Sequence, residues 1–453
     1  MSKTILLRNN LSLIQIAKKD TKLFNISLFV QAGSSLEDGY YPQGTSNFVE
    51  KLILTGTEKH PSSDSIHLAI ESLGGSFYSS TSYEYTFFSL TVPSFNKFKA
   101  VGLLSEIIQK TYISRDKIEK LKRQLTREIP NIYENYDDSS LQLSMSSVYK
   151  DTGLGANIKG TADRISDISI EDVEEYLSRQ YQPANCILSI GGNFEYDDVS
   201  AIIEQEWGNW HAKSRNSLLS VEPEIEEIIE MFDCRQKVSD QTQITLNFRL
   251  DMGYLPTPYW PSQELETKKP YNDVLSEFLV RYAGLLLLST ILGDGQGSKL
   301  YQKTVIEDKL ANHTESNLLF FKFTGILQLI VLCENGDFNY VLESVLKTLD
   351  NLQKNMISIT ELMRAKSCLK AKIININENL GTMALWNALH ISQTQLEFSI
   401  DQLFEVIDGF DANDIRNLSK EIFSTKNLTI ATLGTAKGTK ILEKLVVKYL
   451  DNL

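Results

Sequence analysis

A long internal repeat is the feature that most constrains the fold of this chain. The segment that starts at Asp172 runs through a helical pattern and a turn into a hydrophobic stretch that ends at Gly192. The segment that starts at Asp414 does the same and ends at Gly434, 242 residues further along. Each segment has the pattern of an amphipathic helix, a short turn and a buried strand that ends at glycine. The shared order and spacing predict two similar halves.

Other predicted elements recur in the same order in both halves. Alternating strands, aromatic and β-branched stretches and pairs of amphipathic helices follow one another at 23–32, 77–93, 95–110 and 114–129, and again at 243–250, 318–333, 338–353 and 358–376. This pattern predicts an α+β fold with two homologous α/β sandwich domains, each a mixed sheet packed with helices.

The predicted boundary lies where the periodic pattern stops. We expect an N-terminal domain at 1–215, a linker at 216–235 that includes an acidic run, and a C-terminal domain at 236–453. A second irregular stretch, 251–273, contains four of the ten prolines and several aromatic residues. A loop of this length is either a contact with a partner or substrate, or a simple surface excursion.

Charge and cysteine content limit the partners and the compartment. The 58 acidic residues outnumber the 45 basic ones, and a net charge of -13 argues against nucleic acid as the main partner. The four cysteines lack the close spacing of a zinc ribbon or redox motif, which predicts free thiols in a reducing compartment. The first residues do not resemble a signal peptide, and the longest apolar stretch, 283–292, is about half of a membrane span. We therefore expect a cytoplasmic protein without a membrane span.

One segment carries a specific resemblance. Residues 44–57 read Gly-Thr-Ser-Asn-Phe-Val-Glu-Lys-Leu-Ile-Leu-Thr-Gly-Thr. This resembles the signature of the pitrilysin, insulinase and mitochondrial-processing-peptidase family of zinc proteases, the inverzincins, which have His-x-x-Glu-His on a helix. Segments at 31–38, 70–77, 79–86 and 292–302 also resemble the family, so the resemblance spans essentially the whole chain.

The resemblance assigns the family's zinc site to four positions of this chain. The two histidine positions fall on Asn47 and Lys51, the general base falls on Glu50, and the later glutamate ligand falls on Glu128. Asn is a poor zinc ligand, and a protonated Lys has no lone pair to give a metal. None of the five histidines forms a pair with metal-ligand spacing. We therefore expect vestigial positions, no metal, no cofactor and no catalytic activity.

Two further predictions concern the positions where active family members bind zinc and substrate. Lys51 and Glu128 would form an ion pair in place of the zinc, or else these helix positions are simply solvated. Active members also supply an Arg and a Tyr from the second half, and these positions fall near Val305 and Asn312. Neither residue can polarise a carbonyl group as those side chains do.

The glycine-rich segment of the second half contains Gly293, Gly295 and Gly297. It has neither the phosphate-loop spacing nor the Gly-x-Gly-x-x-Gly spacing, which argues against nucleotide binding. Noncatalytic family members carry a flexible glycine-rich loop that contacts substrate, and the resemblance implies such a role here. The alternative is a structural strand-to-helix turn or a helix cap.

Together these observations predict a noncatalytic peptidase-family subunit. It would pair with a zinc-bearing homologue, or with a second copy of itself, to form a chamber that binds peptides. The alternatives are a structural core-type protein without peptide processing and an active peptidase with an atypical site.

Overall fold

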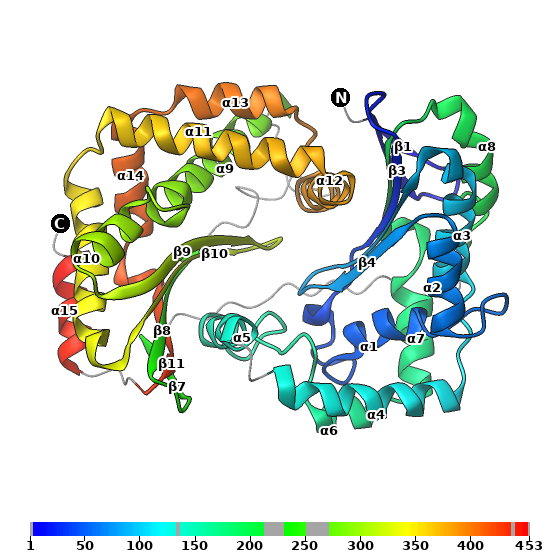
Figure 1. The fold of residues 1–453 in the computed structure, drawn as a ribbon, viewed down its shortest axis with the longest axis horizontal. Helices are drawn as coiled ribbons and strands as arrows, with labels where there is room; N and C mark the ends of the chain where they lie inside the picture. The colour runs from blue at the N-terminus through cyan, green and yellow to red at the C-terminus, as the bar shows by residue number, and fades with distance from the viewer. Residues whose placement is uncertain (1–2, 133–135, 213–230, 251–270, 436–439, 452–453) are drawn as a thin grey trace, which may run out of the picture. The chain divides into compact units, whose positions relative to one another are not determined.

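The computed structural model describes residues 3–132, 136–212, 231–250, 271–435 and 440–451. The chain forms two compact units, each built around its own mixed sheet (Figure 1). Within the described residues, unit 1 contains 3–132, 151–212 and 375–392, and unit 2 contains 136–150, 231–374 and 393–451. Most of the predicted linker at 216–235 and of the proline-rich stretch at 251–273 lies outside the described residues.

The sheet of unit 1 has six strands in the order β1-β2-β6-β3-β5-β4. Strand β6 pairs in parallel with β2, and the other neighbours pair antiparallel. The strands are β1 (Lys3–Leu6), β2 (Ser12–Ala17), β3 (Leu23–Val30), β4 (Ser76–Thr81), β5 (Thr86–Pro93) and β6 (Cys186–Gly192). This order leaves β4 at one edge of the sheet.

The sheet of unit 2 repeats this arrangement with five strands in the order β7-β11-β8-β10-β9. The strands are β7 (Phe232–Gln236), β8 (Gln241–Leu250), β9 (Ala311–Phe320), β10 (Gly325–Glu334) and β11 (Leu428–Gly434). Again one pair, β11 with β7, is parallel. The order matches β2-β6-β3-β5-β4 strand for strand, so the predicted duplication and the fold class are confirmed.

Helices α1, α2 and α3 lie on one face of the first sheet (Figure 1). Their apolar faces complete a core in which Phe48 and Leu52 of α1 and Leu104 of α3 have no exposed surface. The helices of unit 1 are η1 (Ser34–Leu36), α1 (Thr45–Ile53), α2 (Ser63–Ser72), η2 (Ser94–Asn96), α3 (Lys97–Gln109), α4 (Arg115–Ile132), α6 (Ala162–Asp167), α7 (Ile170–Gln180), η3 (Pro183–Asn185) and α8 (Tyr196–Glu206).

The helices of unit 2 include one long apolar helix, α9, at Tyr271–Gly293. Helix α9 is long and apolar enough to cross a membrane, but 72% of its most apolar window is buried inside the fold. The remaining helices are η4 (Tyr301–Glu307, a π-helix), η5 (Asn335–Asp337), α10 (Phe338–Lys354), α11 (Ile359–Glu378), α13 (Ile400–Gly409), α14 (Ala412–Ile422), η6 (Thr425–Asn427) and α15 (Lys440–Leu450).

Two helices belong to the unit opposite to the one that their place in the sequence suggests. Helix α12 (Leu380–Thr394) lies within the second half of the sequence, yet its Leu380 and Met383 pack on Ile14 and Phe29 of the first sheet. Helix α5 (Tyr136–Val148) lies within the first half and packs on β11 and β8 of the second sheet. Each unit therefore completes its packing with a helix from the other half of the sequence, which periodicity alone did not predict.

Candidate functional site

Helix α1 carries the positions of the zinc signature, and the loop before it fixes where the helix starts. Gly44 precedes the helix with a φ of +93°, a left-handed conformation that favours glycine. A Cβ here would lie 2.7 Å from Ile165 Cδ1 and 2.9 Å from the carbonyl oxygen of Lys159. The carboxylate of Glu37 accepts hydrogen bonds from the backbone N–H groups of Gly44 and Ser46, both at 2.6 Å. These bonds satisfy N–H groups that a helix start leaves unpaired.

Glu37 is itself almost completely buried, with 1% of its surface exposed. Burial raises the pKa of this carboxyl to about 8, although the hydrogen bonds from Ser46 and Gly44 act in the opposite direction. The buried hydroxyl of Tyr176 on α7 donates to Ser46 Oγ at 2.8 Å. The start of α1 is therefore held by a buried polar network.

The carboxylate of Glu50 lies at the centre of the site and has no exposed surface. Its Oε1 accepts from Ser79 Oγ at 2.6 Å and from Lys51 Nζ at 3.0 Å. Its Oε2 accepts from Thr81 Oγ1 at 2.8 Å and from Asn47 Nδ2 at 3.3 Å. Helix α1 supplies two of these donors and the edge strand β4 supplies the other two.

In this arrangement each oxygen of Glu50 already accepts two hydrogen bonds. A base needs a lone pair that faces the proton it removes, whereas both oxygens of Glu50 are buried and each accepts two hydrogen bonds. The donor set also does not fit zinc, because an ammonium and an amide occupy the two positions of the signature histidines. In the described residues no group of three or more His, Cys, Asp or Glu side chains could hold a metal ion.

The structure brings together three of the four positions that the resemblance assigns to the zinc site and leaves out the fourth. Asn47 and Lys51 both donate to Glu50, but Glu128 is exposed on α4 and accepts a hydrogen bond from Gln124 at 2.9 Å. Lys51 forms its ion pair with Glu50, at 3.0 Å. Within the part of the chain that the structure describes, no ion pair joins Lys51 to Glu128. The neighbouring buried carboxylate, one residue away, is thus the partner of the ammonium.

The glycine-rich segment is a short turn from α9 towards η4, so a helix rather than a strand precedes it. Gly295 has a φ of +77°, and a Cβ on Gly293 would lie 2.4 Å from the backbone nitrogen of Ser316. Arg364 of α11 donates to the carbonyl oxygens of Thr290 and Asp294, both at 3.3 Å, and so caps the end of α9. The substrate contact expected at Gly293, Gly295 and Gly297 stays a prediction.

The positions of the family's Arg and Tyr lie in an irregular part of unit 2. Val305 lies half-buried within the π-helix η4. Asn312 is the extra residue of a bulge in β9, since Leu332 pairs with His313 and Cys333 pairs with Ala311. Neither side chain carries a charge that could bind a carbonyl oxygen.

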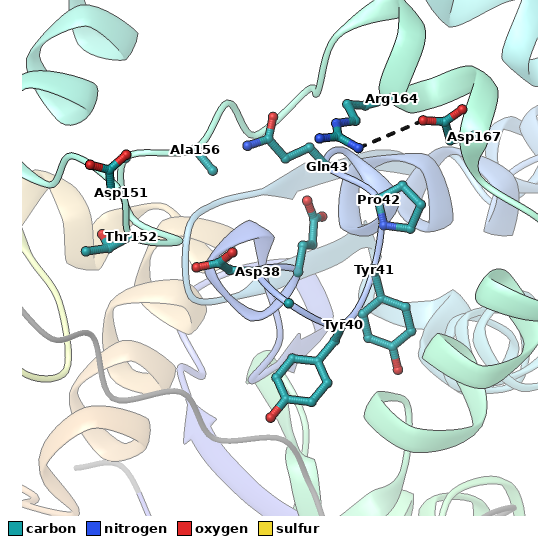
Figure 2. Close-up of a pocket in the computed structure, with 13 residues that line it drawn as sticks. Asp38, Tyr40, Tyr41, Pro42, Gln43, Asp151, Thr152, Ala156, Arg164 and Asp167 are labelled. Carbon is teal, nitrogen blue, oxygen red and sulfur yellow. Dashed lines mark ion pairs between the residues drawn. The ribbon is translucent and has the colours of Figure 1, made fainter.

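A hollow of about 700 Å³ opens beside the loop that precedes α1 (Figure 2). The loop before α1 lines one side, and the segment that leads into α6 lines the other. Arg164 pairs with Asp167 at 4.0 Å, as the dashed line in Figure 2 marks, while Asp38 and Asp151 add two more carboxylates. The hollow is therefore polar, with more acidic than basic side chains.

Sequence reasoning missed the residues that hold the site together. Ser79 and Thr81 are two apart in a strand, a spacing that places both side chains on one face, and this signal was present in the sequence. Their contact with Glu50 depends on how β4 packs against α1, which strand periodicity does not determine. Glu37 gave no comparable signal, because capping by a residue seven positions before Gly44 depends on the path of the loop.

Comparison with protein families agrees with the resemblance. Residues 13–162 match the family model described as Insulinase (Peptidase family M16), and residues 167–369 match the model described as Peptidase M16 inactive domain. The two models together cover most of the chain. The chain therefore belongs to the M16 peptidase family.

Relatives and solved structures match over nearly the full length. An uncharacterized zinc protease of Rickettsia felis is 24% identical, over 92% of this chain and 94% of its own. The human mitochondrial-processing peptidase subunit beta is 22% identical, over 94% of this chain and 83% of its own. A protease from Helicobacter pylori has a similar fold, with a TM-score of 0.82 at 17% identity over 96% of this chain and 99% of its own.

Replacing Lys51 with Met tests the ion pair. The variant leaves the buried carboxylate of Glu50 with neutral donors alone, which we expect to lower the free energy of unfolding by about 1–3 kcal/mol. We expect a loss near the lower end of this range, because 42% of the Lys51 side chain is exposed and solvent screens its charge. Urea unfolding measures the loss, and Lys99→Met at an exposed position of α3 is the matched control. Equal stability of the two variants would show that the pair contributes nothing.

Replacing Glu37 with Gln tests the buried carboxyl at the start of α1. Because its pKa is about 8 in the folded chain and ordinarily 4.5, the unfolded chain loses this proton first as the pH rises. The wild type should therefore lose stability relative to Glu37→Gln as the pH rises from about 4.5 to about 8. Urea midpoints across this range measure both slopes. Parallel slopes would contradict the assignment.

Proposed function

We propose that this chain is a noncatalytic M16 subunit that holds an extended peptide for a zinc-bearing homologue. The observation that carries the proposal is the state of Glu50. Its buried carboxylate is saturated by four donors, and one of them is the Lys51 ammonium at a position where the family signature has histidine. The framework of a peptidase is kept while the base and metal chemistry is lost.

The edge strand β4 supports the peptide-binding part of the proposal. Strand β4 ends the sheet of unit 1, and its six residues Ser76–Thr81 include no charged residue and no proline. Natural edge strands often carry such residues to block pairing with another chain, so this edge is open to strand addition. Since Ser79 and Thr81 contact Glu50, a peptide added here would pass the former catalytic position.

The acidic hollow beside α1 supports a preference for a basic side chain in that peptide. Asp38 and Asp151 line it together with the paired Asp167 and Arg164, so the balance of charge is negative. A Lys or Arg side chain of a bound peptide would find complementary charge there. The overall net charge of -13 acts in the same direction.

A structural role is the second candidate. A chain from a structure of Complex III2 from Candida albicans has a similar fold, with a TM-score of 0.74 at 17% identity over 95% of both chains. A chain of this fold therefore also occurs in a multi-chain complex. Under this alternative, the chain would bind no peptide and stimulate no cleavage.

Peptide cleavage with and without a catalytic partner separates these candidates. We expect the purified chain to cleave a fluorogenic peptide no faster than its Glu50→Gln variant, because neither has a free base. Adding a homologue with an intact His-x-x-Glu-His motif from the same source should raise the cleavage rate above that of the homologue alone. Cleavage by the chain alone that Glu50→Gln abolishes would refute the proposal, and no stimulation would favour the structural role.

Strand addition at β4 makes a separate prediction about the peptide backbone. Two versions of one extended peptide are N-methylated at alternate residues, offset by one position. Only every second N–H of a strand faces its partner in a β ladder, so one version should bind about tenfold more weakly than the other. Fluorescence anisotropy with labelled peptides measures both affinities. Equal affinities would exclude pairing along a strand edge.

A further inference from the structure

The outward face of helix α4 carries a row of positive charge. The apolar face of the helix is buried in the core of unit 1 through Ile118, Leu121, Leu125 and Ile129. On the opposite face, Lys120, Arg123 and Arg127 are all exposed and are spaced three and four residues apart. This spacing places them one above another along the helix. The row is positive although the chain as a whole has a net charge of -13.

These three cations do not serve the fold. Among the described residues, Lys120, Arg123 and Arg127 form no ion pair and no side-chain hydrogen bond. Their neighbour Lys122 differs, because it pairs with Glu119 at 3.3 Å and donates to the carbonyl oxygen of Ser166 at 3.1 Å. Three acidic residues of α4 are exposed as well. Asp116 lies in the first turn, where the helix dipole favours negative charge, Glu119 pairs with Lys122, and Glu128 accepts a hydrogen bond from Gln124.

The corresponding helix of unit 2 shows what such cations do when they are structural. Helix α11 follows the same pair of strands as α4, and it carries four cations. Arg364 caps α9, Lys366 donates to the carbonyl oxygens of Asp408 and Phe410, Lys370 pairs with Asp408, and Lys372 pairs with Asp294. The duplicated scaffold therefore uses the cations of α11 internally and leaves those of α4 on the surface.

We propose that this face of α4, formed by Lys120, Arg123 and Arg127, is a docking surface for an acidic helix of a partner protein. From Lys120 to Arg127 the helix rises about 10 Å, so carboxylates three or four residues apart on a facing helix would match the row. A lipid surface fits less well, because the apolar face that would enter the membrane interface is buried in the core. Three cations are also fewer than stable nucleic-acid binding requires.

The docking surface does not depend on the proposed peptide function. The surface lies on the outer side of α4, and neither β4 nor Glu50 contributes to it. Binding at α4 can therefore be measured on the purified full-length chain without a peptide or a catalytic homologue. Failure here would leave the proposed function untouched, and the reverse also holds.

Binding of a model acidic peptide tests the proposal. The probe is a fluorescein-labelled helical peptide of Ala and Glu with its glutamates on one face, and phosphatidylserine vesicles and a single-stranded oligonucleotide are the competing probes. The variant Lys120→Gln/Arg123→Gln/Arg127→Gln removes the row. The matched control, Lys3→Gln/Lys99→Gln/Lys110→Gln, removes three exposed and scattered cations of the same unit. Circular dichroism checks that both variants are folded.

We expect the Kd of the helical acidic peptide to rise about tenfold or more in the α4 variant and to change little in the control. The affinity should also fall with added salt, because exposed charges are screened within about 10 Å at moderate ionic strength. Equal losses in both variants would show a nonspecific charge effect and overturn the proposal. Absent binding, or α4-dependent binding of the vesicles or the oligonucleotide in place of the peptide, would also overturn it.

Discussion

The buried carboxylate of Glu50 is the interaction on which the site of unit 1 depends. A carboxylate removed from water must be matched by donors, and here α1 and β4 each supply two of them. The same four bonds tie the helix to the edge strand and remove the lone pairs that a base would use. The carboxylate thereby links α1 to β4, and the Lys51 ammonium supplies a positive charge beside it.

The overall fold was predictable because hydrophobic period is a local property of the sequence. Strands such as β6 and β11 are short, apolar and end at glycine, and their repeat at a fixed distance predicted both sheets. The positions of Asn47, Glu50 and Lys51 followed from one motif on one helix. The pairing of Lys51 was not predictable, because the choice between Glu50 and Glu128 depends on how α1 packs against α4. The packing of α12 on the first sheet and of α5 on the second was not predicted for a similar reason. The apolar face of α12 does not indicate which sheet it covers.

Duplication has given the chain two copies of one scaffold with different surface chemistry. The strand orders agree, and so do the helices that follow the β4–β5 hairpin of unit 1 and the β9–β10 hairpin of unit 2. The differences lie in the polar side chains. The cations of α11 bind carbonyl and carboxylate groups of unit 2, whereas Lys120, Arg123 and Arg127 of α4 are exposed. The edge strands also differ. Ser79 and Thr81 of β4 donate to the buried carboxylate of Glu50, whereas the corresponding edge strand β9 contains a bulge. The two units therefore share an arrangement of strands and differ in the polar side chains that their helices and edge strands carry.

Helices α5 and α12, which each pack on the sheet of the other half of the sequence, affect folding during synthesis of the chain. Helix α12 can pack on the first sheet only after residue 392 has left the ribosome. Until then Ile14, Phe29 and Phe87 of that sheet are not covered by α12. Neither half can be cut out as an autonomous domain without exposing an apolar sheet face. Each unit is therefore complete only when both halves of the chain have been synthesised, which would keep a duplicated gene of this kind from separating into two independent proteins.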